Sequence, residues 1–236
     1  MARRLENRLA LVTGASRGIG AAVAKRFAAE GAHVVLVART QGGLEEVDDA
    51  IREAGGTATL VPLDLQDFDA IDRLAAVLAE RHGKLDILLG NAAILGALSP
   101  MSHYEPATWQ QVIDVNLNAN WRLIRDFDAL LRASDAGRAL FVTSGVVENI
   151  RAYWGPYAAS KAGLENMVQS WAAELTKTNV RANLIDPGRV RTGMRRQAYP
   201  GEDASKNPYP DAITDLFVTL AEPACTKNGE KVSVAR

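Results

Sequence analysis

The chain has few residues of the types that bind metals or form disulfides. Cys225 is the only cysteine among 236 residues, which excludes an internal disulfide and a cysteine-rich zinc site. The three histidines, His33, His82 and His103, are far apart and lack metal-ligand spacing. We therefore expect them to be surface or packing residues, and we expect no metal centre.

Long apolar runs and a strong charge of one sign are also missing. No stretch approaches the ~20 apolar residues that cross a bilayer, and the charged residues 1–7 are not followed by an apolar run of the signal-peptide type. The formal net charge is -1, so neither nucleic acid nor an anionic membrane is an expected partner. These absences predict a cytoplasmic protein.

The chain instead alternates short β-branched apolar runs with alanine-rich amphipathic stretches. Run length, period and glycine punctuation distinguish the two kinds of segment. They predict strands at residues 9–13, 33–38, 59–63, 85–90, 138–144, 180–185 and 231–234. They predict helices at residues 19–30, 44–54, 68–82, 106–132, 155–176 and 211–221.

This alternation predicts an α/β fold: a doubly wound parallel sheet of about seven strands with helices on both faces, hence three layers. The length favours one domain over residues 1–236. Only the segment 189–210 departs from this alternation of strands and helices, with three prolines and two glycines. Because it follows the carboxyl end of a strand, where open α/β sheets bind ligands, we predict that it is a substrate lid.

A glycine-rich turn joins the first predicted strand to the first helix. Glycines in such a turn let the backbone approach a pyrophosphate, and the helix start offers free N–H groups and a positive dipole end. The alternative is a tight turn that needs glycine only for its geometry. The predicted cofactor-binding residues are Gly14, Ser16, Arg17, Gly18, Ile19 and Gly20.

The end of the second predicted strand indicates which dinucleotide is bound. An acidic residue at this point usually binds the ribose 2′-OH, but here the residue is Arg39. A cation can pair with a 2′-phosphate, and Arg17 can approach the same phosphate from the glycine turn. We therefore predict NADP(H), with NAD(H) as the alternative if both arginines are merely solvated.

Several further motifs make the sequence similar to the short-chain dehydrogenase/reductase (SDR) family. Residues 13–20 have the family's glycine spacing, and Tyr157 and Lys161 form a Tyr-x-x-x-Lys motif. Ser144 lies 13 positions before Tyr157, the family's usual offset (157 − 144 = 13), and Asn116 falls at the position of the family's helix asparagine. The resemblance implies a Rossmann fold, a catalytic set of these four residues, and cofactor contacts from Tyr157 and Lys161.

The resemblance also implies further cofactor-binding residues. These are Asp64 and Leu65 near the adenine, Asn91 and Ala92 after the fourth strand, and Pro187, Gly188, Val190 and Thr192 near the nicotinamide. The sequence departs from the family's Asn-Asn-Ala-Gly segment at Gly90 and Ala93. Residues 118–144 and 153–161 resemble a bacterial subgroup most closely, which indicates a chemistry but no particular substrate.

The chemistry of the tyrosine–lysine pair fits this expectation. Four residues apart on a helix, Tyr157 and Lys161 share one face. A tyrosine has a pKa near ~10, and a neighbouring ammonium favours the phenolate. We predict that Tyr157 exchanges a proton with a carbonyl or secondary-alcohol substrate, that Ser144 hydrogen-bonds the substrate oxygen, and that Asn116 holds a water that passes protons to Lys161.

Other readings concern the assembly and the pocket. A cofactor-binding regulator or scaffold without turnover is the alternative to an enzyme. In the family, the helices corresponding to 106–132 and 155–176 form a dimer interface, so a homodimer or homotetramer is expected. Tyr153, Trp154 and residues 94–96 are candidates for the substrate pocket. Arg195 and Arg196 either meet an acidic or phosphorylated substrate or lie in a solvated lid.

Overall fold

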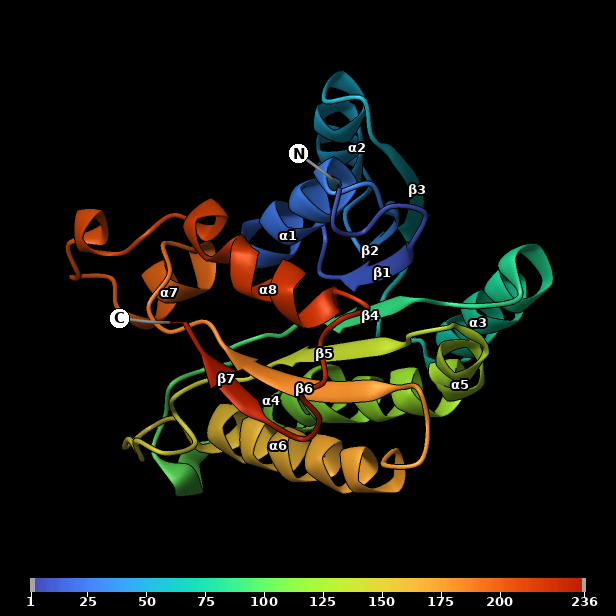
Figure 1. The fold of residues 1–236 in the computed structure, drawn as a ribbon. Helices are drawn as coiled ribbons and strands as arrows, with labels where there is room; N and C mark the ends of the chain where they lie inside the picture. Colours follow the sequence, from blue (N-terminus) through green and yellow to red (C-terminus); the bar gives the residue numbers. More distant parts are fainter. Residues whose placement is uncertain (1–2, 235–236) are drawn as a thin grey trace.

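The computed structural model describes residues 3–234 and contains one sheet of seven parallel strands (Figure 1). The strand order is β3-β2-β1-β4-β5-β6-β7, so the chain begins in the middle, runs to one edge, and returns to β4. The strands are β1 (Leu9–Thr13), β2 (His33–Ala38), β3 (Thr57–Pro62), β4 (Ile87–Gly90), β5 (Arg138–Val142), β6 (Arg181–Asp186) and β7 (Lys231–Ser233). The expected α/β fold is therefore confirmed, and all seven strands lie within two residues of their predicted bounds.

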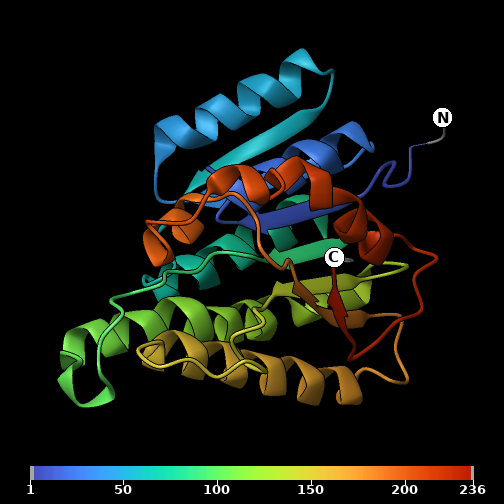
Figure 2. The same cartoon turned by 90° about the vertical axis from the view of Figure 1, so that its left-hand side faces the viewer.

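Helices cover both faces of the sheet (Figures 1 and 2). One face carries α1 (Gly18–Ala29), α2 (Gln41–Glu53) and α8 (Thr214–Ala221), whose apolar residues form one core cluster. The other carries α3 (Phe68–His82), α5 (Ala119–Ala133) and α6 (Gly155–Glu174) over a second cluster. The short helices α4 (Pro106–Ile113) and α7 (Gly193–Ala198) lie in the connections after β4 and β6.

The strand sequences explain this layering. All five residues of β1 are buried, as expected of a parallel strand covered on both faces. Leu9 and Leu11 belong to the core cluster under α3, α5 and α6, whereas Ala10 and Val12 belong to the opposite cluster. This alternation follows from the two-residue period of a strand.

The predicted helix 106–132 is wrong in one respect. The π-helical turn η2 (Asp114–Asn118) separates α4 from α5. Side chains stabilise it: Asn118 Nδ2 donates to Asp114 Oδ1 at 2.7 Å, and Asn120 Nδ2 donates to the Asn116 carbonyl at 2.8 Å. Turns of this kind often occur at functional sites, and this one contains Asn116.

Two predictions near the C-terminus also need correction. The segment 189–210, predicted as a loop, contains α7, which begins where Thr192 Oγ1 accepts a hydrogen bond from Arg195 N. The helix predicted at 211–221 starts as a 3-10 turn, Pro210–Ile213, before α8. Within residues 3–234, no helix is long and apolar enough to cross a membrane, and no three His, Cys, Asp or Glu side chains are grouped as metal ligands.

Candidate active site

The predicted site residues lie together at the carboxyl ends of β1, β4, β5 and β6. The glycine turn after β1 requires glycine at its two ends. Gly14 has φ +66°, and a Cβ at Gly20 would lie 2.2 Å from the Gly14 carbonyl oxygen. Arg17, the N-cap residue of α1, makes no capping bond through its side chain. The first turn of α1 therefore presents its N–H groups at the point where the strand order reverses, a geometry suited to a phosphate.

A polar clasp joins β1 to the segment after β4. Thr13 Oγ1 donates to the Leu89 carbonyl at 3.1 Å and accepts from Asn91 N at 2.9 Å and Ala92 N at 3.1 Å. Asn91 Nδ2 returns a hydrogen bond to the Thr13 carbonyl at 2.9 Å. Asn91 and Ala92 thus lie beside the glycine turn. Sequence reasoning missed the role of Thr13, although it opens the glycine motif.

The departure from the family pattern at Gly90 has a packing explanation. A Cβ at this position would lie 2.4 Å from Cδ1 of Phe141 and 2.5 Å from Oδ1 of Asn120. Asn120 is itself buried and bonds the Asn116 carbonyl. The space that a side chain would need is therefore already filled by Asn120 and by the ring of Phe141.

Tyr157 lies on α6 with only 7% of its surface exposed. Burial raises the pKa of its phenol to about 12, the neighbouring Ser144 hydroxyl acts to lower that pKa, and the Asp186 carboxylate acts to raise it. The phenol is therefore protonated at neutral pH in the protein alone. It packs with Leu95 and Val146 in a small apolar cluster.

Lys161 follows one helical turn later and is 2% exposed. Its ammonium group donates to the Val142 carbonyl at 2.7 Å and lies 5.9 Å from the centre of the Tyr157 ring. Burial lowers the pKa of Lys161 to about 8, while the Glu165 carboxylate acts to raise it. The structure therefore brings Ser144, Tyr157 and Lys161 together, as the sequence predicts.

Asn116 is fully buried in the π-helical turn. Its Oδ1 accepts from Ile94 N at 2.8 Å, and its Nδ2 donates to the Ile94 carbonyl at 2.9 Å and to Ser160 Oγ at 3.1 Å. Both amide hydrogens are thus used within the protein. The side chain fixes the backbone after β4, and the predicted water between Asn116 and Lys161 stays a prediction.

The residues predicted to hold the adenosine end lie at the ends of β2 and β3. The Arg39 guanidinium is 55% exposed and lies 3.8 Å from the Asp64 carboxylate, which also accepts a hydrogen bond from Gln66 N. Leu65 is buried, and Arg17 is exposed at the start of α1. Ser16 packs against the first turn of α2, where a Cβ at Gly43 would lie 3.0 Å from its own Cβ.

The segment after β6 lies on the other side of the site, at the carboxyl end of the sheet. Gly188 has φ +68°, and its N–H donates to Asp186 Oδ1 at 3.0 Å. Pro187 is half-buried and Val190 is buried. The Thr192 methyl group would lie 3.7 Å from a Cβ at Gly18, so this segment reaches the glycine turn.

The segment 189–210 packs against the apolar cluster around the tyrosine. Met194 and Ala198 of α7 lie against the apolar cluster that contains Tyr157. Arg195 forms two hydrogen bonds to Glu202, at 2.5 and 2.6 Å, and its guanidinium lies 3.8 Å from the centre of the Tyr199 ring. Of the two alternatives for Arg195, this pairing favours the one in which it does not meet the substrate, because Glu202 balances its charge within the segment. Arg196 is exposed.

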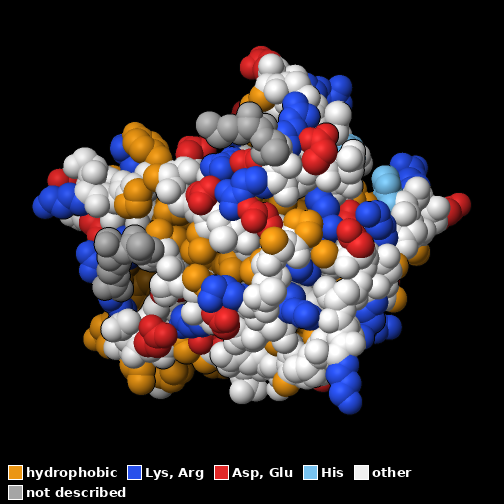
Figure 3. Space-filling view, viewed as in Figure 1, with side chains coloured by type: hydrophobic (Ala, Val, Ile, Leu, Met, Phe, Trp, Pro, Cys, Tyr) orange, Lys and Arg blue, Asp and Glu red, His pale blue; other side chains and the backbone are white. Residues whose placement is uncertain are grey.

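An apolar cavity of about 670 Å³ adjoins this cluster. Val146, Trp154 and Ala158 line the cavity and also belong to the Tyr157 cluster, with the Trp154 ring centre 5.8 Å from that of Tyr157. Among the described residues that line it, Arg151 is the one charged side chain, and it donates to the Tyr199 hydroxyl at 2.5 Å. Apolar side chains gather on the surface at this end of α6 (Figure 3), and the exposed ones in the lining are Met101, Ile150 and Tyr153.

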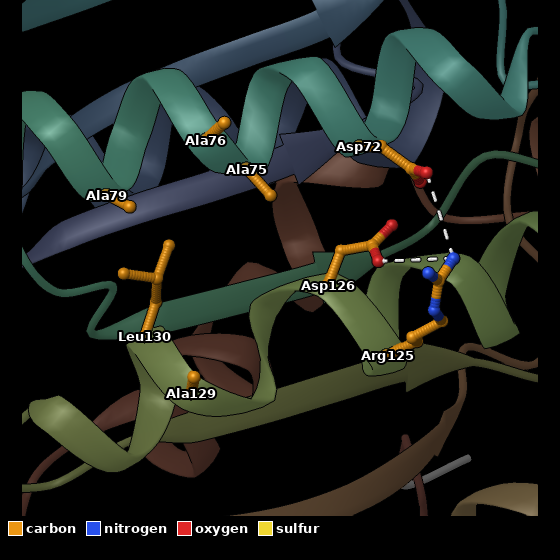
Figure 4. Close-up of a pocket in the computed structure, with 8 residues that line it drawn as sticks. All are labelled: Asp72, Ala75, Ala76, Ala79, Arg125, Asp126, Ala129 and Leu130. Carbon is orange, nitrogen blue, oxygen red and sulfur yellow. Dashed lines mark ion pairs between the residues drawn. The ribbon is translucent and has the colours of Figure 1, made fainter.

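A second cavity, of about 440 Å³, lies between α3 and α5, and none of the predicted site residues lines it (Figure 4). Alanines line much of it, and Asp72 and Asp126 face Arg125 at one end. Burial and the neighbouring Asp72 carboxylate raise the pKa of Asp126 to about 6. One oxygen of Asp126 is buried without a hydrogen-bond partner.

The strand order and the glycine turn together define a Rossmann-type α/β protein. A family model described as short chain dehydrogenase matches residues 8–203. The chain is 40% identical over 219 residues to YciK, an uncharacterized oxidoreductase of Escherichia coli K12, covering 92% of this chain and 86% of that protein. The chain belongs to the short-chain dehydrogenase family.

Solved structures agree with this assignment. A short chain dehydrogenase from Pseudomonas syringae has a TM-score of 0.95 at 41% identity, covering 99% of this chain and 96% of that one. A second, from Shigella flexneri and complexed with NADP, has a TM-score of 0.94 at 38% identity and covers 99% of each chain. The expected family and fold are therefore confirmed.

Proposed function

We propose that the protein transfers a hydride between NADP(H) and a carbonyl or secondary-alcohol substrate, with Tyr157 as the proton donor and acceptor. The observation that carries this proposal is the burial of Tyr157 and Lys161 beside Ser144, at the sheet edge where the glycine turn opens. The NADP-bound relative from Shigella flexneri supports the cofactor. The residues of the glycine turn, the clasp and the Pro187–Thr192 segment are proposed to hold it.

The nicotinamide, when bound, supplies or accepts the hydride. Tyr157 then carries the proton chemistry. In the reducing direction a protonated phenol is the required donor, and its raised pKa keeps it protonated. Ser144 donates a hydrogen bond to the substrate oxygen, and the Lys161 ammonium stabilises the phenolate left after transfer. Asn116 fixes the backbone of Ile94 beside this site.

The preference for NADP(H) rests on Arg39 and Arg17. Both are exposed at the carboxyl end of the sheet, where the adenosine ribose would lie. In the described part of the chain, Asp64 is the only carboxylate paired with Arg39. Arg39→Ala should raise KM for NADPH by about tenfold and leave KM for NADH nearly unchanged. Wild-type protein that uses NADH as well as NADPH would contradict the preference.

We further propose that residues 189–210 act as a lid on one catalytic domain and that the substrate is largely apolar. Met194 and Ala198 pack against the apolar cluster that contains Tyr157, so movement of this segment would open a path to the tyrosine. The volume of the adjoining cavity, about 670 Å³, lies in the range of small-molecule sites, and none of its described lining residues is acidic. Ala158→Trp should fill the cavity and raise KM for bulky ketones more than for acetone, whereas equal effects would contradict this placement.

A homodimer or homotetramer through α5 and α6 belongs to the same proposal. Trp121 of α5 is 49% exposed, an apolar area that an interface would cover. Light scattering at micromolar concentration should give at least twice the 25.4 kDa chain mass. A monomer that turns over substrate would contradict this part alone.

The decisive test is NADPH consumption with a panel of ketones, quinones and 3-oxoacyl thioesters. Tyr157→Phe should lower kcat by at least about three orders of magnitude. The variant should still bind NADPH with wild-type affinity in a fluorescence titration. Near-full activity of Tyr157→Phe would refute the assigned role. Binding of NADPH without turnover of any panel member would favour the regulator or scaffold.

A further inference from the structure

Glu165 stands one turn beyond Lys161 on α6 and is the acidic side chain on this helix that acts on it. Its side chain is 13% exposed. Its Oε1 accepts a hydrogen bond from Thr143 Oγ1 at 2.6 Å. Thr143 is buried and immediately precedes Ser144, so this bond links the helix of Tyr157 and Lys161 to the strand end that presents Ser144.

The same oxygen holds a second partner from the edge of the sheet. Lys231 of β7 donates to Glu165 Oε1 at 2.6 Å and lies 3.2 Å from Glu148 in the connection before α6. The Lys231 side chain is 14% exposed, whereas that of Glu148 is 64% exposed. Glu165 therefore joins α6, β7 and the residue that follows β5 at one side-chain oxygen, and Glu148 is the solvated member of the group.

The charges near Lys161 show what Glu165 does electrostatically. Tyr157 and Glu165 are the titratable groups of α6 on this side, Asp186 faces Tyr157 from the end of β6, and Lys231 and Glu148 face Glu165. Residues four apart on a helix are neighbours, so Glu165 lies next to Lys161. Removing its charge would leave Glu148 as the only carboxylate paired with Lys231 among the described residues and make a charged Lys161 less favourable.

We propose that Glu165 is a positioning residue that fixes Ser144 relative to Tyr157 and keeps the Lys161 side chain cationic. Its importance for turnover rests on the function proposed above, but its effect on Lys161 does not. An electrostatic and a geometric role can be separated, because Glu165→Gln removes the charge while retaining an oxygen that accepts from Thr143. Thr143→Val removes that hydrogen bond while retaining the charge.

The test is a pH titration of Lys161 by NMR in the full-length chain carrying [13Cε]lysine, with and without NADP+. Lys161→Arg assigns the resonance. Glu165→Gln should lower the pKa of Lys161 by about 1 unit, and Glu165→Asp should restore most of the wild-type value. Glu148→Gln is the matched control, since Glu148 also contacts Lys231, and it should shift the pKa of Lys161 by less than about a quarter of that amount.

The outcomes distinguish this proposal from the proposed function. An unchanged Lys161 pKa in Glu165→Gln, or an equal shift in Glu148→Gln, would overturn it even if the enzyme turns over ketones. With a substrate from the panel, Thr143→Val should lower kcat about tenfold at constant KM while the Lys161 pKa stays at its wild-type value. A Thr143→Val variant with wild-type kcat would refute the positioning of Ser144. If Glu165→Gln fails to fold, Glu165→Asp and Thr143→Val still decide the geometric part.

Discussion

Gly90→Ala tests the packing that replaces the family's asparagine in this chain. The new methyl group would lie 2.4 Å from Phe141 Cδ1 and 2.5 Å from Asn120 Oδ1, well inside van der Waals contact. Overpacking of a core typically costs about 1–3 kcal/mol. Displacing Asn120 also breaks its bond to the Asn116 carbonyl, and a buried group left unsatisfied costs about 1–3 kcal/mol. We expect the free energy of unfolding to fall by about 2–6 kcal/mol.

Urea unfolding followed by circular dichroism measures this loss. Gly201→Ala is the matched control, because no atom lies within 4 Å of a Cβ there, and it should change the free energy of unfolding by less than about 0.5 kcal/mol. Gly90→Ala and Asn120→Ala remove the same hydrogen bond, so their effects should be non-additive by about 1 kcal/mol. A loss below about 1 kcal/mol in Gly90→Ala, or full additivity with Asn120→Ala, would show that the site relaxes and that the reasoning is wrong.

Three further predictions concern other contacts. Asp126→Asn should raise the free energy of unfolding at pH 8 by about 1 kcal/mol. The pKa of Asp126 is raised to about 6 in the folded protein, so ionisation of this carboxyl destabilises the fold. The gain should therefore vanish between pH 6 and 4 in urea unfolding experiments. A gain that persists at pH 4 would contradict that cause. Thr13→Val should leave Asn91 N and Ala92 N without a hydrogen-bond acceptor, lower the free energy of unfolding by about 2–4 kcal/mol and weaken NADP(H) binding. Thr13→Ser should restore both properties. Wild-type affinity of Thr13→Val for NADP(H) would contradict a role of the clasp in cofactor binding. Glu202→Gln should accelerate tryptic cleavage after Arg195, which loses its ionic partner; an unchanged rate would mean that α7 is held by packing alone.

The parts of the fold that follow from local pattern were predictable from the sequence. Strands buried on both faces appear as continuous apolar runs, and β1 and β2 were predicted with their observed bounds. The glycine turn was predictable because backbone conformation and close approach demand glycine at Gly14 and Gly20. The resemblance to the family predicted the proximity of Ser144, Tyr157 and Lys161, and Lys161 indeed bonds the carbonyl of Val142 at the end of β5.

Features that depend on contacts between distant segments were not predictable in this way. Asn116 is fixed by the backbone of Ile94, 22 residues away, and no helical period reveals that contact. The Arg195–Glu202 pair requires α7, a six-residue helix whose stability comes from its neighbours. The meeting of Thr143, Glu165 and Lys231 at one oxygen depends on the order of β5, β6 and β7 in the sheet.

The π-helical turn at Asp114–Asn118 determines which side of α5 faces the sheet. A π-helical turn accommodates one more residue than an α-helical turn, and one residue of an α-helix corresponds to about 100° of rotation. If one residue were deleted here and the turn became α-helical, Leu123 and Phe127 would no longer face the sheet in register with α4. A single-residue deletion at this point should therefore be far more harmful than a deletion in the loop around Gly201.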